Sequence, residues 1–252
     1  MLSQVFSQES LSRDSGTQKA LVVRLSSSDE ERRMDTILRL WEIFSETPGS
    51  ADFSTVTALA MTMRSDISPV VRALAVRALE ICRDPRASEP LITALGTESE
   101  LAVRKAIVYA LANYPSRETT SILVPLLKDK EPEIRAAAAA SLSHIRDPLA
   151  APALLEVLQK RSKDEDAFAR SRAAYALGFI GDHTTLDSLI RALIKDKSSD
   201  VRREAAQALG RLATAKDAKA LEALKEIRIS SDPYLTATVD AAIADINSRN
   251  QL

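Results

Sequence analysis

The chain has 252 residues, of which 45% are hydrophobic, 27% are charged and only 4% are aromatic. Its 34 Lys and Arg against 35 Asp and Glu give a net charge of −1, without the basic excess that is typical of general nucleic-acid binders. A single cysteine, Cys82, excludes an intrachain disulfide. Because Ala and Leu dominate and Gly is rare, the composition favours helices, and we expect an all-α protein.

Residues 1–16 are polar and rich in Ser, and they lack the charged start and apolar core of a signal peptide. We expect this segment to be a flexible tail. No apolar run in the sequence approaches the ~18 residues of a membrane span. The sequence therefore predicts a cytoplasmic protein without membrane contact.

From residue 17 onward, amphipathic segments follow one another in pairs. The first member of each pair, helix A, is predicted to begin near residues 17, 52, 86, 117, 149, 184 and 217. The second member, helix B, is predicted to begin near residues 29, 69, 100, 132, 166, 199 and 233. Prolines separate the helices, as in Asp84-Pro85, because Pro is tolerated in a first turn and disfavoured in a helix interior. Seven helix pairs predict a right-handed α-solenoid over residues 17–252.

The segments called helix B share a motif in which an aliphatic residue and an Arg precede small residues and end in Ala-Leu or a close match. The arginines recur every 31 to 35 residues and are Arg72, Arg104, Arg135, Arg170 and Arg202. Counting the aliphatic residue as position 1, positions 1, 5, 8, 9 and 12 are apolar or small, as Val201, Ala205 and Leu209 illustrate. These positions fall on one face of a helix, which predicts the buried stripe of helix B.

An acid stands six residues before each of these arginines. The pairs are Asp66 and Arg72, Glu98 and Arg104, Asp129 and Arg135, Asp164 and Arg170, and Asp196 and Arg202. An Arg in the first turn of helix B can bond the acid of its own or of an adjacent repeat, and the acid can accept N–H groups at the helix start. Because the pairing recurs at one structural position, we interpret it as a structural ladder rather than as catalytic dyads. The end copies depart from it, with Ser27 in the acid position and Thr236 in the Arg position.

Residues 176–182, Ala-Leu-Gly-Phe-Ile-Gly-Asp, together with the upstream Arg and acid, resemble the consensus of phycobilisome-lyase-type HEAT repeats. Residues 208–212 match it in part, and the resemblance covers roughly residues 17 to 249. It implies a HEAT solenoid in which the helices B line the concave face. Such repeats occur in many unrelated proteins, so the resemblance specifies the repeat type and not a function.

Positions 3, 7 and 10 of helix B lie opposite the buried stripe and are expected to face a partner. Along the chain they place Tyr109 and Tyr175 beside a floor of small residues that includes Ala136 and Ala140. Tyr and Arg are enriched among interface hot spots. The candidate partner-binding residues are Arg77, Lys105, Tyr109, Arg172, Tyr175 and Arg203. In the alternative interpretation, the two tyrosines only cover small neighbouring residues.

Signals for catalysis are weak. His144 and His183 fit no zinc pattern, and no Gly-rich phosphate loop is found in the sequence. Deoxyhypusine hydroxylase resembles this fold, but it binds iron through His-Glu dipeptides, and the sequence contains none. We therefore expect no catalytic, metal-binding or cofactor-binding residues and favour a protein without enzymatic activity.

The leading functional hypothesis is a scaffold that binds another protein through the concave face. The alternative that the resemblance suggests is a bilin lyase or a lyase accessory subunit. A HEAT-like DNA-repair protein is less favoured, because the few basic residues on helix B are interleaved with Glu80 and Glu204. The sequence leaves the identity of the partner and the oligomeric state open.

Overall fold

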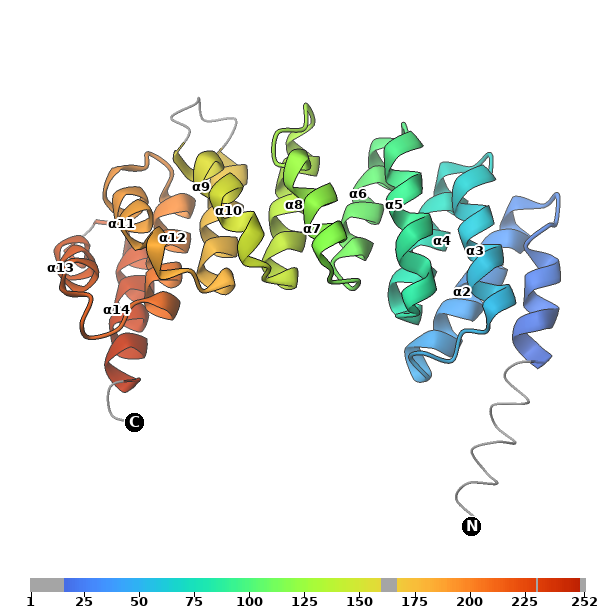
Figure 1. Ribbon diagram of the computed structural model, residues 1–252, viewed down its shortest axis with the longest axis horizontal. Helices are drawn as coiled ribbons and strands as arrows, with labels where there is room; N and C mark the ends of the chain where they lie inside the picture. Colours follow the sequence, from blue (N-terminus) through green and yellow to red (C-terminus); the bar gives the residue numbers. More distant parts are fainter. Residues whose placement is uncertain (1–15, 160–166, 230, 250–252) are drawn as a thin grey trace, which may run out of the picture. The chain divides into compact units, whose positions relative to one another are not determined.

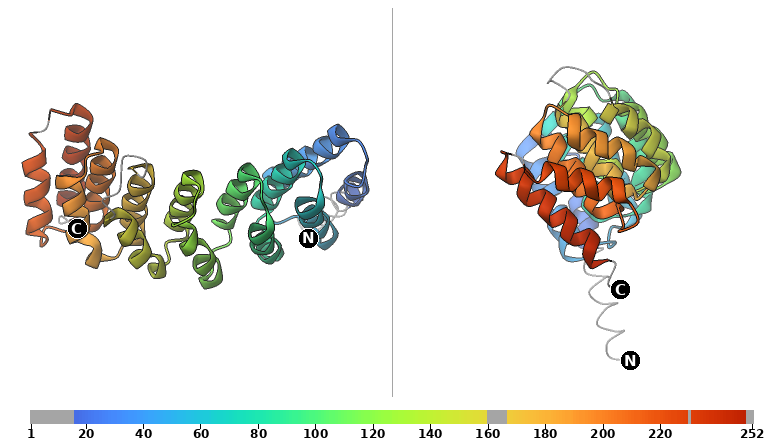
Figure 2. Two further views of the ribbon diagram at one scale, coloured as in Figure 1. Left: turned by 90° about the horizontal axis from the view of Figure 1, so that it is seen from above. Right: turned by 90° about the vertical axis from the view of Figure 1, so that its left-hand side faces the viewer.

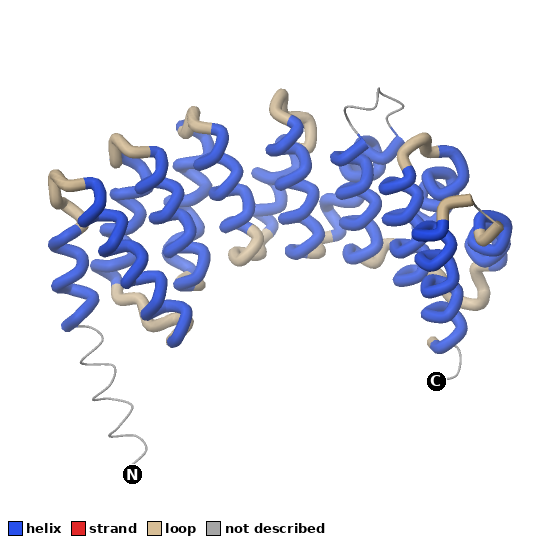
Figure 3. The backbone as a smooth tube through the Cα atoms, turned by 180° about the vertical axis from the view of Figure 1, so that it is seen from behind, coloured by secondary structure: helices blue, strands red, loops and turns tan. Residues whose placement is uncertain are grey.

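The structure is a computed structural model that describes residues 16–159, 167–229 and 231–249. Within these ranges the regular elements are helical, as predicted (Figure 1), and Figure 3 shows them joined by short loops. Of the predicted tail, residues 1–15 lie outside the described ranges, whereas residue 16 is already helical, in a helix described over 16–24. Asp164 also lies outside them.

The described helices form the seven predicted pairs. The helices A are 16–24, α3 (Phe53–Ser65), α5 (Ser88–Thr97), α7 (Arg117–Leu126), α9 (Ala151–Gln159), α11 (Leu186–Lys195) and α13 (Ala218–Ile227). The helices B are α2 (Glu30–Glu46), α4 (Pro69–Cys82), α6 (Leu101–Leu111), α8 (Pro132–Ile145), α10 (Ala167–Ile180), α12 (Ser199–Leu212) and α14 (Pro233–Ser248). Each begins within two residues of its predicted start, which confirms an all-α repeat solenoid.

The chain divides into two compact units, Met1–Tyr114 and Pro115–Leu252. Within each unit a helix B packs against the helix A of its own pair and against neighbouring helices B, and Figure 2 gives two further views of this packing. The apolar stripe predicted for helix B is buried. At position 9 the leucines of five consecutive helices B are fully buried: Leu79, Leu111, Leu142, Leu177 and Leu209.

Three helices B end in the same kind of turn. The residue after the helix has a positive φ of 50°, 58° or 84°, and is Arg83, Arg146 or Gly181 respectively. The next residue is an Asp that accepts a hydrogen bond from the backbone N–H two positions on, namely Asp84, Asp147 or Asp182. Each Asp caps a 3₁₀ turn: Pro85–Ala87, Pro148–Ala150 or His183–Thr185. The repeated turn thus sets the direction in which the chain enters the next helix A.

Two glycines allow the helices B of the second unit to approach closely. A Cβ atom on Gly178 in α10 would lie 2.8 Å from the Cα and Cβ atoms of Ala208 in α12. A Cβ atom on Gly210 would lie 2.9 Å from the same two atoms of Ala242 in α14. Real Cβ atoms do not approach backbone so closely, so any side chain here would force the helices apart.

The prediction that positions 3 and 10 of helix B face a partner is wrong for several helices of the second unit. Ala136, Ser143 and Ser171 are 2%, 7% and 2% exposed, and Gly178 and Gly210 lie in helix contacts. Because helix B has neighbours on three sides, its buried arc is wider than the stripe that the sequence shows. Except for the half-buried Ala140, the predicted floor of small residues is therefore packing between helices.

Candidate partner-binding surface

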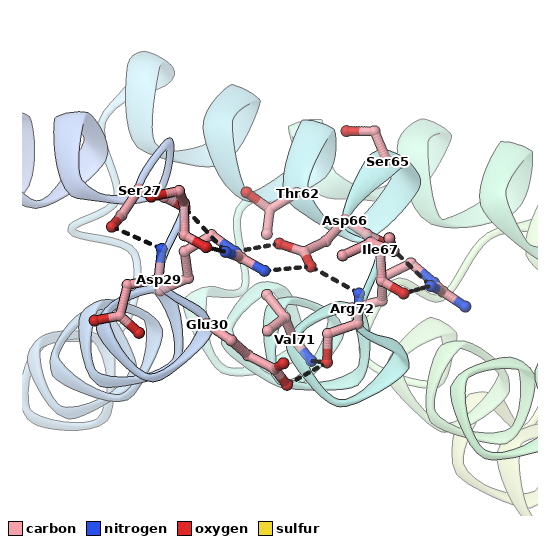
Figure 4. Close-up of polar contacts among 12 residues, drawn as sticks. Ser27, Asp29, Glu30, Thr62, Ser65, Asp66, Ile67, Val71 and Arg72 are labelled. Atoms are coloured by element: carbon pink, nitrogen blue, oxygen red, sulfur yellow. Dashed lines mark hydrogen bonds and ion pairs between the residues drawn. The ribbon is translucent and has the colours of Figure 1, made fainter.

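The recurrent arginine of helix B bonds two repeats at once. Arg72 donates through Nη1 to the carbonyl oxygens of Asp66 and Ile67, in the turn before its own helix, at 2.9 and 3.4 Å. Its Nε and Nη2 atoms donate to the two carboxylate oxygens of Glu98, in the next repeat, at 2.8 and 3.0 Å. Figure 4 shows Arg72 beside the turn residues Asp66 and Ile67, whose carbonyl oxygens accept its bonds. One guanidinium therefore fixes the local turn and the adjacent repeat together.

The same fork is found at two other places. Arg33 reaches the carboxylate of Asp66 at 2.7 and 3.0 Å, and Arg170 reaches that of Asp196 at 2.8 and 3.0 Å. In these three forks the partner acid belongs to the following repeat. Arg33 also donates to the carbonyl of Ser27 at 2.9 Å. The first repeat can carry Ser in the acid position because its Arg needs only the backbone carbonyl there.

Arg135 and Arg202 show the part of the pattern that lies within one repeat. Arg135 donates to the carbonyls of Asp129 and Lys130 at 2.9 and 3.1 Å. Arg202 makes the equivalent bonds to the turn that begins at Asp196, at 2.9 and 3.1 Å. The acid of the repeat that follows Arg104 is Asp129, and these two residues belong to different units.

Each acid of the ladder that the structure describes also orders the start of its own helix B. Its carboxylate accepts the backbone N–H of the residue two positions on, which is the N-cap of the helix. These bonds measure 2.9 to 3.0 Å and join Asp66 to Ser68, Glu98 to Glu100, Asp129 to Glu131, and Asp196 to Ser198. A carboxylate in this position satisfies an N–H group that the helix itself leaves unpaired.

These bonds control the ionisation of Glu98. Burial opposes its negative charge, since its side chain is 8% exposed, but the bonds from Arg72 and from the N–H of Glu100 outweigh that effect. The pKa of the Glu98 carboxyl is therefore lowered. A carboxyl whose pKa is lower in the folded than in the unfolded state stabilises the fold when ionised.

We expect Glu98→Gln to lower the free energy of unfolding at neutral pH by about 2 kcal/mol, because charge-assisted hydrogen bonds are lost. The wild-type contribution is present above the unfolded pKa of about 4.3 and disappears as the pH falls through the lower folded pKa. Urea denaturation at a series of pH values should show the two proteins converging in acid. The control is Glu89→Gln, an exposed acid of α5. A difference of constant size at all pH values would contradict the assignment.

In the first unit, the predicted partner-binding residues lie on the adjacent helices α4 and α6. Arg77 is exposed and forms an ion pair with Glu80 at 3.1 Å, one turn further along α4. Tyr109 is 39% exposed, and Lys105, one turn before it in α6, is half-buried. Tyr109 therefore presents its ring at the surface of the first unit.

In the second unit, Arg172 lies between aromatic rings and an acid. Its guanidinium carbon lies 5.2 Å from the ring centre of Tyr175 and 5.7 Å from that of Phe168. It also forms an ion pair of 2.7 Å with Glu204 of α12. The third predicted residue, Arg203, pairs with Asp200 in its own helix and, at 3.5 Å, with Asp232 before α14. Arg172 and Tyr175 are thus brought together, while Arg203 has acidic partners of its own.

Two residues that the sequence analysis did not identify complete the site. Phe179 lies one turn after Tyr175 in α10, with its ring centre 4.6 Å from that of Tyr175. Arg211 of α12 lies over both rings, 4.2 Å from the centre of Phe179 and 5.3 Å from that of Tyr175. We call Arg172, Tyr175, Phe179, Glu204 and Arg211 the arginine–aromatic cluster. Its cation–π contacts, each worth about 0.5–1 kcal/mol at exposed sites, hold the guanidinium groups in fixed orientations.

Glu204 is the acid of this cluster. One carboxylate oxygen bonds Arg172, and the other is buried without a hydrogen-bond partner among the described residues. Burial raises the pKa of the Glu204 carboxyl in spite of the nearby Arg172 and Arg211. The cluster thus contains two guanidinium groups and one enclosed carboxylate, which pairs with Arg172, so its formal charge is positive.

A groove of about 410 Å³ adjoins the cluster between α12 and α14. Its lining comprises Gln207, Arg211, Ala237, Thr238, Ala241, Ala242 and Asp245. Arg211 belongs to both the cluster and the groove, so the two form one surface on the helices B. A separate groove of about 480 Å³ lies between the helices A of the first unit, α3 and α5, beside Phe53 and Met61.

The comparisons with known proteins agree with this repeat architecture. The sequence profile of HEAT repeats matches residues 56–123, 88–169 and 158–244, which overlap and cover most of the chain. The chain belongs to the HEAT-repeat family. This confirms the family predicted from the sequence. The comparison of this HEAT-repeat chain with curated proteins found no match.

Solved structures share the HEAT-repeat fold at low sequence identity. The complex of CpcE and CpcF of phycocyanin lyase from Nostoc sp. PCC7120 is 19% identical, with a TM-score of 0.53 over 91% of this chain and 94% of that one. A designed armadillo repeat protein in complex with the peptide (KR)4 is 18% identical, with a TM-score of 0.47 over 90% and 98%. Human deoxyhypusine hydroxylase is 18% identical, with a TM-score of 0.41 over 92% and 96%. The similarity to the phycocyanin lyase complex concerns the fold.

Other potentially reactive groups of the HEAT-repeat chain are buried or lie apart from one another in the described ranges. Cys82 is fully buried, and burial raises the pKa of its thiol, so the sulfur is protonated near neutral pH. In the described ranges, His, Cys, Asp and Glu side chains do not gather in groups of three or more that could hold a metal ion. No helix in those ranges combines the length and the apolar character that a membrane span requires.

Proposed function

We propose that this HEAT-repeat chain is a scaffold that binds another protein through the helices B of its second unit. The observation that carries the proposal is the arginine–aromatic cluster beside the α12–α14 groove. Tyr and Arg are the residue types most often found at interface hot spots, and here both are accessible in part. Since stacking fixes the guanidinium groups beforehand, a partner loses little binding energy to ordering them.

The first unit contains a second accessible Tyr. Tyr109 occupies position 7 of its helix B, the same repeat position as Tyr175. Arg77 and Lys105 lie on the same unit. We propose that these three residues form a second binding surface on the first unit, and that the protein acts in the cytoplasm, as the sequence suggests.

The test is affinity capture on immobilised wild-type chain from an extract of the cells that make it, followed by titration with the purified captured protein. Tyr175→Ala is expected to weaken binding about 30-fold, because a hot-spot truncation costs at least about 2 kcal/mol. The control is Phe53→Ala, which removes an aromatic ring that is 69% exposed on a helix A. Loss of binding with Phe53→Ala alone would place the interface on the helices A instead.

The same experiment addresses the alternative functions. A retained tetrapyrrole pigment would replace the scaffold with a bilin lyase or lyase accessory role. Retained DNA whose binding weakens steeply with salt would support a DNA-binding role, because contacts to phosphate release counterions. Neither is expected from a surface on which Asp200, Glu204 and Asp232 accompany the arginines.

A further inference from the structure

We infer that the α12–α14 groove binds a partner segment with one acidic and one basic side chain, separated by small or apolar residues. The inference rests on the proposed function and specifies its partner. It follows from the opposite charges on the two walls of the groove. Arg211 on α12 is the one cation of the lining and Asp245 on α14 is the one anion.

The floor of the groove is suited to a peptide backbone. Ala237, Ala241 and Ala242 of α14 contribute only methyl groups, so a chain can approach the helix closely. The volume of about 410 Å³ lies within the range of about 300–1,000 Å³ that is usual for ligand sites in proteins. A short run of small or apolar residues fills such a space without burying unpaired polar groups.

Arg211 is the residue of the lining that can bind a carboxylate. The rings of Tyr175 and Phe179 hold its guanidinium, and Nη2 donates to the amide oxygen of Gln207 at 3.1 Å. In the described part of the chain, Arg211 has no acid within ion-pair distance. A carboxylate bonds a guanidinium more strongly than a neutral amide does, and the exposed side chain of Gln207 is free to move aside.

Asp245 supplies the opposite charge. Its side chain is exposed on α14, and it forms no ion pair with any described residue. A Lys or Arg of the partner would therefore meet a carboxylate that is not already neutralised. The two opposite charges also disfavour a polyanion such as nucleic acid, because Asp245 would repel its phosphates. The groove thus selects both the composition and the direction of a bound peptide.

The experiment is selection of a library of random linear peptides on the full chain. We expect enriched peptides to share an acid and a base in a fixed order. Arg211→Ala should weaken binding of the consensus peptide at least about tenfold, or 1.4 kcal/mol, while Arg211→Lys retains part of it. In the double variant Arg211→Asp/Asp245→Arg, the order of acid and base in the enriched peptides should reverse.

A matched control is Lys219→Asp/Glu222→Arg, which reverses two exposed charges of the same unit on the helix A α13. Its peptides should keep the wild-type order. Circular dichroism and the melting temperature of each variant identify loss of folding, so that only folded variants are compared. Reversal in the groove variant with no change in the control supports the inference.

Two further outcomes separate the inference from the proposed function. Enriched peptides without charges, insensitive to Arg211→Ala but lost with Tyr175→Ala, would overturn the inference and leave the scaffold function standing. If no peptide is enriched, or if the enriched peptides are insensitive to both variants, both the inference and the second-unit binding surface are overturned.

Discussion

Arg72→Ala is expected to lower the free energy of unfolding of the first unit by about 3 kcal/mol, as measured by urea denaturation. Four hydrogen bonds are lost, and Glu98 keeps a charge that is mostly shielded from water without its guanidinium partner. Removing one member of a buried ion pair typically costs 3–5 kcal/mol, and the partial exposure of this pair places it at the lower end.

The control is Arg77→Ala, in the same helix and with the same change of side chain. Arg77 is exposed and pairs only with Glu80 in its own helix, a kind of contact worth at most about 1 kcal/mol. Arg72→Lys should restore little stability, because an ammonium cannot form the fork to Glu98. Equal losses for Arg72→Ala and Arg77→Ala would show that the ladder does not stabilise the stack of repeats.

Gly178→Ala should destabilise the second unit by about 2 kcal/mol, the range in which overpacking of a tight contact falls. The added methyl group would lie 2.8 Å from the Cα atom of Ala208, and this backbone atom cannot move without shifting α12. The melting temperature and urea midpoint of the purified variant provide the measurement.

Gly96→Ala is the matched variant with the opposite expected sign. Gly96 lies in α5, and a Cβ atom there would meet no atom of another element within 4 Å. Ala is favoured over Gly in a helix by about 1 kcal/mol, so this variant should be more stable than wild type. If both glycine variants changed stability in the same direction, close packing at Gly178 would not be the cause.

The helix boundaries could be predicted because the signals for them are local. Pro69, Pro132 and Pro233 each stand in the first turn of a helix B, and Ser68 accepts the N–H of Val71 at the start of α4. These contacts involve residues within a few positions of each other. They therefore form in the same way whatever the neighbouring repeat contains.

The choice of ladder partner could not be predicted, because it depends on how repeats stack. The sequence places Asp66 six residues before Arg72, but the carboxylate of Asp66 turns to Arg33 of the preceding repeat. The buried arc of helix B was underestimated for the same reason. Ser143 and Gly178 look like surface positions in a single helix and become buried only when the next helix B is added.

Only part of the arginine–aromatic cluster could be predicted from the sequence, because its contacts join adjacent repeats. Arg172 and Tyr175 were identified on one helix, whereas Phe179 and Arg211 were not. Phe179 and Arg211 occupy the same repeat position in adjacent repeats, and Arg172 and Glu204 do so as well. Equivalent positions of neighbouring helices B come into contact, so reading positions 4 and 11 across repeats would have found both pairs.

The direction in which the ladder forks run affects how whole repeats can be gained or lost. Each described fork joins the Arg of one repeat to the acid of the following repeat, so in the repeats that these forks join, the acid faces the predecessor and the Arg faces the successor. A duplicated or deleted repeat, cut at equivalent points, therefore preserves the matching of charges on both sides. Pairing confined within single repeats would impose no such rule on neighbours. The ladder makes the repeat, rather than the residue, the unit in which insertions and deletions are tolerated.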